Sequence, residues 1–249
     1  MDYEADHPFS FPIVKWKPDN HEELTTALVD NAYKLKNGNV KGAVLSHGWR
    51  NATTREMNLV DDKDDYEKHG YSSYRSGISL FADPYIDDFK DLHDAAFQAC
   101  YRYINASNWD KPDADLDNLG LLNHAWVSIY GNGHFIPEHV HTDSHLSWVF
   151  YGASDGDTGR IIFRNPAAPV FRMSYQEDAE LFFETWKLPP EVGCFYVFPS
   201  FMSHWTEQHL GDDDRIIYSG NFVFTRSVTG HGTLHRTSRV ADELGGRGL

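Results

Sequence analysis

The feature that most limits the possible folds is a series of short β-rich runs between His124 and Phe224. Turn-forming residues separate these runs, most clearly at residues 131–133, 154–159 and 211–214. Many short strands divided by such turns are typical of a β-sandwich or a jelly roll. We expect strands at Ala125–Tyr130, Leu146–Tyr151, Arg160–Phe163, Cys194–Phe198 and Ile216–Phe224.

Two helices are expected in the N-terminal half. The first runs from about His21 to Lys36, because its leucines recur near one side and Asn37-Gly38 follows as a termination signal. The second begins at Asp83-Pro84, a capping residue followed by a proline in the first turn, and continues to about Ile104. A shorter helical piece is expected around residues 176–186.

These elements predict a single domain over residues 1–249, mainly β with flanking N-terminal helices. Its parts are a helical and loop region at 1–120, a jelly-roll core at 121–226 and a tail at 227–249. The polar segment 46–79 is long for a loop, which is typical of a lid or of a poorly ordered segment. We expect this segment and the tail to select the substrate.

The charge balance limits the class of partner. The chain has 22 Lys and Arg against 37 Asp and Glu, a formal net charge of −15. Nucleic acids and anionic membranes are bound through Lys and Arg, so neither is expected as a partner. The sequence has no signal-peptide pattern and no apolar run of roughly 18 residues, which favours a cytoplasmic protein acting on a small molecule or peptide. It carries no signal for oligomeric state.

Histidines with a regular spacing are the main candidates for chemistry. Residues i and i+2 of a strand point to the same face, so His139 and His141 can reach one point in space. A third histidine, His204, follows a buried run and a proline turn, and Arg215 comes eleven residues later. Imidazole binds iron well, and three ligands that leave positions open allow a chelating co-substrate and oxygen to bind. The planar fork of an arginine suits a carboxylate of such a co-substrate.

Several motifs in a fixed order resemble the bacterial and phage family of 2-oxoglutarate/iron(II) oxygenases. The resemblance covers about Ala125 to Phe224 and implies a double-stranded β-helix (jelly roll, cupin-like) that uses Fe(II), 2-oxoglutarate and O2. The motifs are His139-x-His141, Gly159-x-x-x-Phe163, Phe198-Pro-Ser-x-x-x-His204 and Arg215-Ile-x-x-Ser219-x-Asn221.

The resemblance also implies roles for individual residues. His139 and His204 stand at positions of iron ligands, and Arg215 stands where the distal carboxylate of 2-oxoglutarate is bound. Ser219 and Tyr151 are expected to add hydrogen bonds to that co-substrate. The sequence departs from the family pattern at Trp148, where the family has glycine, and at Ile217, where it has serine.

The remaining metal ligand has two candidates. Prolyl-hydroxylase-type enzymes, which the lead-in to His139 also resembles, read H-x-D at this place, so His141 stands where a carboxylate is usual. One option is a three-histidine site of His139, His141 and His204, which the lead-in spacing favours. The other is that Asp143 is a ligand in place of His139 or His141; in the first case His141-Thr-Asp143 is the H-x-D pair, with His139 behind it.

Three functions are compatible with these patterns. The favoured one is hydroxylation of a small molecule, amino acid or peptide with release of succinate and CO2. The second is a cupin-type three-histidine enzyme without 2-oxoglutarate, since the spacing also resembles the cupin motifs, with His145 where glutamate is usual. The third is a jelly-roll binding protein without catalysis.

Overall fold

The computed structural model describes residues 11–38, 70–74, 78–107, 119–156, 158–168 and 184–226. The N-terminal elements are β1 (Val14–Trp16), α1 (His21–Lys36), β2 (Tyr71–Ser72), the 3-10 helix η2 (Ile86–Phe89) and α3 (Lys90–Ala106). The core strands are β3 (Leu119–Tyr130), β4 (Leu146–Ala153), β5 (Ile161–Arg164), β6 (Thr185–Leu188), β7 (Phe195–Pro199), β8 (His204–Thr206) and β9 (Arg215–Arg226).

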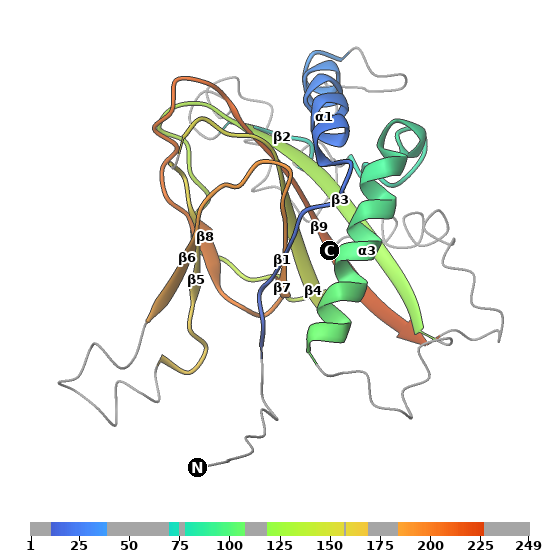
Figure 1. The fold of residues 1–249 in the computed structure, drawn as a ribbon, viewed down its shortest axis with the longest axis vertical. Coiled ribbons are helices and arrows are strands. Elements are labelled where there is room, and N and C mark those ends of the chain that lie inside the picture. The colour runs from blue at the N-terminus through green and yellow to red at the C-terminus, as the bar shows by residue number, and fades with distance from the viewer. Residues whose placement is uncertain are drawn as a thin grey trace, which may run out of the picture.

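The strands form two antiparallel sheets. The larger sheet has six strands in the order β1-β7-β4-β9-β3-β2, and the smaller has three in the order β6-β5-β8. Figure 1 shows the smaller sheet on one side of the larger sheet and helices α1 and α3 on the other. Strands that lie far apart in the sequence are neighbours in both sheets, which is the arrangement of a double-stranded β-helix. The predicted fold class is confirmed.

Each face of the larger sheet has its own apolar core, because side chains alternate along a strand. On β4, Trp148 and Phe150 join the cluster formed with α1 and α3, whereas Val149 and Tyr151 join a second cluster between the sheets. Strand β9 alternates in the same way, with Tyr218 on the helix side and Ile217 on the inner side. The inner side is where a ligand can be enclosed.

All five predicted strands are present, and α1 has the predicted bounds. The second helix differs at its start. The amides of Tyr85 and Ile86 both bond to the carbonyl oxygen of Ala82, so tight turns and η2 precede the α-helix, which begins only at Lys90. The predicted strands also omitted β1, β2 and β8, which are only two or three residues long.

The helix expected around residues 176–186 is wrong at its C-terminal end. Residues 185–188 form strand β6, in which Trp186 lies opposite Phe163 of β5. Pairing with β5 decides the conformation here, because four residues are too few to settle it by periodicity. The rest of that prediction lies outside the described residues, as do most of segment 46–79 and the tail. None of the described helices is long and apolar enough to cross a membrane.

Candidate metal centre and co-substrate pocket

His139 and His204 are joined through their backbones. The amide of His139 donates to the carbonyl oxygen of His204 at 2.9 Å, and the amide of His204 donates to that of His139 at 3.0 Å. The amide of His141 donates to the carbonyl oxygen of Ser200 at 3.0 Å. The segment between β3 and β4 is thus fixed along β8 and the loop before it, although 65 residues separate the two histidines.

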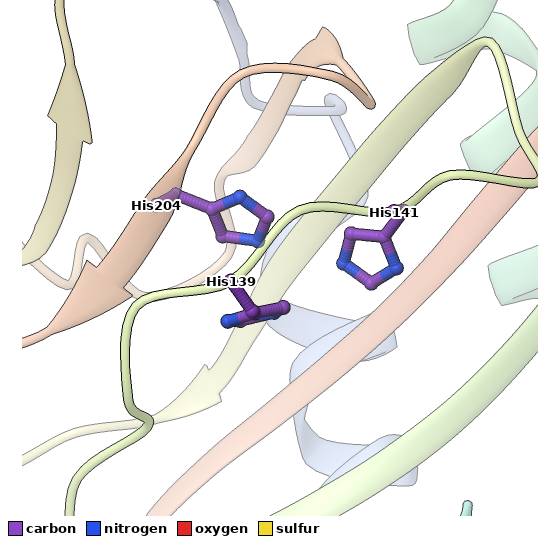
Figure 2. Close-up of side chains that lie close together, drawn as sticks. All are labelled: His139, His141 and His204. Atoms are coloured by element: carbon purple, nitrogen blue, oxygen red, sulfur yellow. The ribbon is translucent and has the colours of Figure 1, made fainter.

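The three predicted histidines come together. One ring nitrogen from each of His139, His141 and His204 lies within 4.8 Å of the others. The ring centroids are 4.2 Å apart for His139 and His204, 5.1 Å for His139 and His141, and 5.3 Å for His141 and His204. Figure 2 shows the rings gathered about one space, with His204 on β8 and the other two on the segment before β4.

The protonation of these rings suits a metal. Burial lowers the pKa of His204 to about 3 and that of His141 to about 4, and neighbouring histidines add to both shifts. Both rings are therefore neutral near pH 7 and keep a lone pair for a cation. A set of three imidazoles with room for further ligands fits Fe(II), and also fits Zn(II) or Co(II).

An ion pair between Glu138 and Arg164 joins the segment that carries His139 to the segment that carries His204. Glu138, next to His139, accepts hydrogen bonds from Arg164 at Nε (2.6 Å) and Nη2 (2.7 Å), and from the hydroxyl of Ser203 (2.6 Å). Ser203 directly precedes His204. Arg164 and Ser203 lower the pKa of Glu138 to about 2. The contact between Glu138, Arg164 and Ser203 could not be predicted, because nothing in the spacing of these residues in the sequence indicates that they meet.

Asp143 and His145 do not join the histidine cluster. Both are exposed, and the cluster found among the described residues contains only the three histidines. The Nδ1 atom of His145 accepts a hydrogen bond from the backbone amide of Phe224 at 3.1 Å. His145 therefore does not occupy the position that the cupin comparison requires of it.

A cavity of about 310 Å³ opens beside the histidines and lies between the two sheets. Its walls include Tyr151 of β4 and Ser219 of β9, the two residues expected to contact a co-substrate. On the β3 side its walls include Trp126 and Ser128. The three predicted ligands thus surround one space with Tyr151 and Ser219, whereas Arg215, the third predicted co-substrate residue, is not among the residues that line it.

Arg215 is fully buried next to this cavity, with 0% of its surface exposed. Its Nη1 atom donates to the carbonyl oxygen of Gly159 at 2.6 Å, and Nη2 lies 3.4 Å from the hydroxyl of Thr206, a cavity residue. Its Nε atom has no hydrogen-bond partner, and no ion pair between Arg215 and a carboxylate occurs in the described part of the chain. An uncompensated buried cation costs several kcal/mol, which an anionic ligand offsets.

Gly159 and Thr206 complete the surroundings of Arg215. Gly159 has a φ of +71°, and a side chain there would collide with the guanidinium. Thr206 lies two residues after His204 on β8, so both side chains face the cavity. The sequence analysis took Gly159 only as part of a motif and missed Thr206, which the i, i+2 rule applied to His204 would have identified.

Comparisons with known proteins bear on the same region. The family model described as "Putative 2OG-Fe(II) oxygenase" matches residues 124–221. The structure is similar to that of EvdO2 from Micromonospora carbonacea var. aurantiaca, with 14% identity over 92% of this chain and 96% of that chain and a TM-score of 0.50. It is also similar to a Pseudomonas putida prolyl-4-hydroxylase, with 15% identity, coverage of 86% and 93%, and a TM-score of 0.49. No curated protein matches the sequence.

Proposed function

We propose that this chain is an Fe(II)- and 2-oxoglutarate-dependent oxygenase that hydroxylates a small molecule or peptide, since residues 124–221 match the family model described as "Putative 2OG-Fe(II) oxygenase". Such an enzyme is an oxidoreductase that uses Fe(II), 2-oxoglutarate and O2. In the proposed site, His139, His141 and His204 hold the iron. Arg215 binds the distal carboxylate of 2-oxoglutarate, with Ser219 and Tyr151 as further contacts.

The observation that carries this proposal is the buried guanidinium of Arg215 beside the histidine cavity, which has no carboxylate partner among the described residues. Thr206 and Tyr151 line the cavity and both interact with Arg215. The hydroxyl of Thr206 lies within hydrogen-bond distance of the guanidinium, and the phenol of Tyr151 interacts with it electrostatically. A carboxylate placed between Thr206 and Tyr151 would lie close to the charged donors of Arg215. Such charge-assisted hydrogen bonds are about twice as strong as neutral ones.

The residues of this chain have three tasks in the proposed reaction. The imidazoles of His139, His141 and His204 would hold the cation. Arg215 anchors 2-oxoglutarate so that its keto acid end is directed toward the histidines. Bound iron supplies the oxygen chemistry that couples conversion of 2-oxoglutarate and O2 to succinate and CO2 with insertion of one oxygen atom into a C–H bond. The apolar walls, including Ile161 and Ile217, exclude water.

The β2–β3 side of the cavity is proposed to receive the substrate. The ring of Trp126 lies 6.0 Å from that of His141 and 5.1 Å from that of Tyr74. The hydroxyl of Ser128 donates to that of Ser72 at 3.0 Å on the same wall. No Asp, Glu or Lys lines the cavity within the described ranges. These contacts favour a substrate that presents an uncharged ring or hydrocarbon face to the metal.

The proposed function is tested with protein reconstituted with Fe(II). We expect it to bind about one iron per chain and to convert 2-oxoglutarate slowly to succinate even without a substrate. The measurement is succinate formation by NMR, with protein treated with a metal chelator as the control. Iron-loaded protein that neither binds 2-oxoglutarate nor forms succinate would contradict the proposal.

A further inference from the structure

Two of the three clustered imidazole rings have an acceptor fixed to Nδ1. The Nδ1 atom of His139 lies 2.8 Å from the carbonyl oxygen of Pro137, and that of His204 lies 2.9 Å from the carbonyl oxygen of Met202. A carbonyl oxygen only accepts hydrogen bonds, so in both rings Nδ1 carries a proton. The lone pair on Nε2 is then available to a metal, as is usual for metal-binding histidines.

His141 has a partner of a different kind. Its Nδ1 atom lies 3.2 Å from the amide nitrogen Nδ2 of Asn221. In this orientation the amide donates, so the proton of the neutral His141 ring is on Nε2, where it blocks metal binding. A half-turn of the amide places Oδ1 at the same point, and Oδ1 accepts the proton of Nδ1 and frees Nε2. The two orientations differ little in shape.

The hydroxyl groups behind Asn221 accommodate both orientations. The Oγ atom of Ser147 donates to Oδ1 of Asn221 at 2.8 Å and lies 2.9 Å from Oγ of Ser200. A hydroxyl both donates and accepts, so after the amide turns, Ser147 accepts from Nδ2 and donates to Ser200. The backbone amide of His141 donates to the backbone carbonyl oxygen of the same Ser200 at 3.0 Å. One network therefore holds both the backbone and the ring of His141.

We propose that Asn221 is a positioning residue that selects the metal-binding tautomer of His141 by presenting its amide oxygen to Nδ1. Asn221 lies at a central place on β9, with its backbone opposite Ser147 of β4 and His124 of β3, and the hydroxyl of Ser147 holds its side chain. The selection requires no change of charge, only a half-turn of one amide and a reorientation of the hydroxyls of the same network, which also includes Ser144. This inference rests on the proposed function, in which His141 is a metal ligand.

The test uses Asn221→Ala, which removes the partner, and Asn221→Asp, which is nearly the same size and can only accept. Asn132→Asp is the control for added negative charge, because Asn132 is exposed and lies outside the cavity lining. Zn(II) is the probe: its dissociation constant is measured by competition with a chelating dye. Long-range ¹H–¹⁵N NMR spectra of the imidazoles, with and without Zn(II), report which nitrogen of each ring carries the proton.

We expect Asn221→Ala to raise the dissociation constant for Zn(II) about 10- to 100-fold. In metal-free Asn221→Ala protein the His141 ring should show no Nδ1–H signal, because no acceptor holds that proton. Asn221→Asp, which can only accept, should restore the affinity and show the Nδ1–H tautomer even without metal, whereas Asn132→Asp should leave both affinity and tautomer as in the wild type. A restored affinity in Asn221→Asp has two possible causes: an acceptor at Nδ1 of His141, or a general attraction of the metal by the added negative charge. Only the first cause also places the proton on Nδ1, which the NMR signal reports.

Two results overturn the inference alone, and a third overturns the proposed site with it. One is an Asn221→Ala protein with wild-type affinity and tautomer. The other is a folded Asn221→Asp protein, judged by its circular dichroism, that binds Zn(II) as weakly as Asn221→Ala or worse; this result is informative even when Asn221→Ala does not fold. Wild-type protein in which Zn(II) shifts the nitrogen signals of His139 and His204 but not those of His141 overturns the three-histidine site as well.

Discussion

His139 and His204 face each other as a backbone-paired couple, each amide bonded to the other's carbonyl oxygen at 2.9 and 3.0 Å. Because these bonds involve only the main chain, they place both rings without depending on either side chain. The centroids of the two rings are 4.2 Å apart. A side chain that binds the metal can therefore be removed at this site without breaking the backbone contacts that fold it.

Replacing His204 with alanine should abolish stable binding of Fe(II) while leaving the fold intact. The side chain supplies one of three proposed ligands, and the backbone pairing with His139 stays. His145→Ala is the matched control, since His145 is exposed and outside the cluster. Metal content by mass spectrometry and the far-ultraviolet circular dichroism spectrum check both parts. Stoichiometric iron in His204→Ala protein contradicts the ligand assignment.

Replacing Arg215 with methionine should weaken binding of 2-oxoglutarate roughly 10- to 100-fold, the loss expected for hydrogen bonds to a charged group. Arg215→Lys should recover only part of the affinity, because an ammonium group cannot form the two parallel bonds of the guanidinium. Calorimetric titration of Zn(II)-loaded protein with 2-oxoglutarate measures this. Arg102→Met, on the outer side of α3 above Trp16, should bind normally. Equal affinity in the Arg215 and Arg102 variants excludes Arg215 as the anchor.

Alanine substitutions at Gly159 and Gly156 distinguish two effects, backbone strain and collision with the guanidinium of Arg215. Their φ angles are +71° and +68°, so alanine at either position should cost about 1–2 kcal/mol of unfolding free energy. A Cβ at Gly159 would also collide with the guanidinium of Arg215, whereas a Cβ at Gly156 meets nothing within 4 Å. Only Gly159→Ala should therefore weaken 2-oxoglutarate binding, measured by the same titration. A similar loss in Gly156→Ala points to the turn's backbone instead.

The stability of the metal-free protein should decrease as the pH falls below about 6.5, the unfolded-state pKa of histidine. Burial lowers the folded-state pKa to about 3 for His204 and about 4 for His141 and His124. Between these values the unfolded chain binds more protons than the folded one, so acid favours unfolding. Urea unfolding at pH 7 and at pH 5 measures the change. His204→Ala should reduce this dependence, and an unchanged dependence in that variant contradicts the prediction.

The aromatic side chains that line the cavity, such as Trp126, predict the class of substrate. Indole should bind to the Zn(II)- and 2-oxoglutarate-loaded protein more tightly than benzylammonium does, because the described cavity lining offers rings and hydroxyls but no carboxylate. Saturation-transfer NMR with both compounds detects the contact. Trp126→Leu should remove the indole signal, and Trp186→Leu should not, since Trp186 is 51% exposed on β6 and does not line the cavity. Tighter binding of benzylammonium contradicts the proposed class.

The sequence by itself determined the local elements and the donor types of the site. Turn signals and alternating apolar runs located all five predicted strands, because those patterns are properties of the chain within a few residues. The spacing of His139, His141 and His204 identified three ligand candidates in the same way. The order of motifs indicated the family, since each motif is itself local.

Only the tertiary structure decided how these pieces meet. The short strand β8 and strand β6 owe their conformation to pairing with β5, which sequence periodicity does not encode. The choice between His141 and Asp143 depends on which side chain turns toward the other two histidines, and Asp143 is exposed. Likewise the fit of Arg215 against Gly159, and the contact of Asn221 with His141, join residues 56 and 80 positions apart. Such contacts follow from the packing of the two sheets, and no local pattern records them.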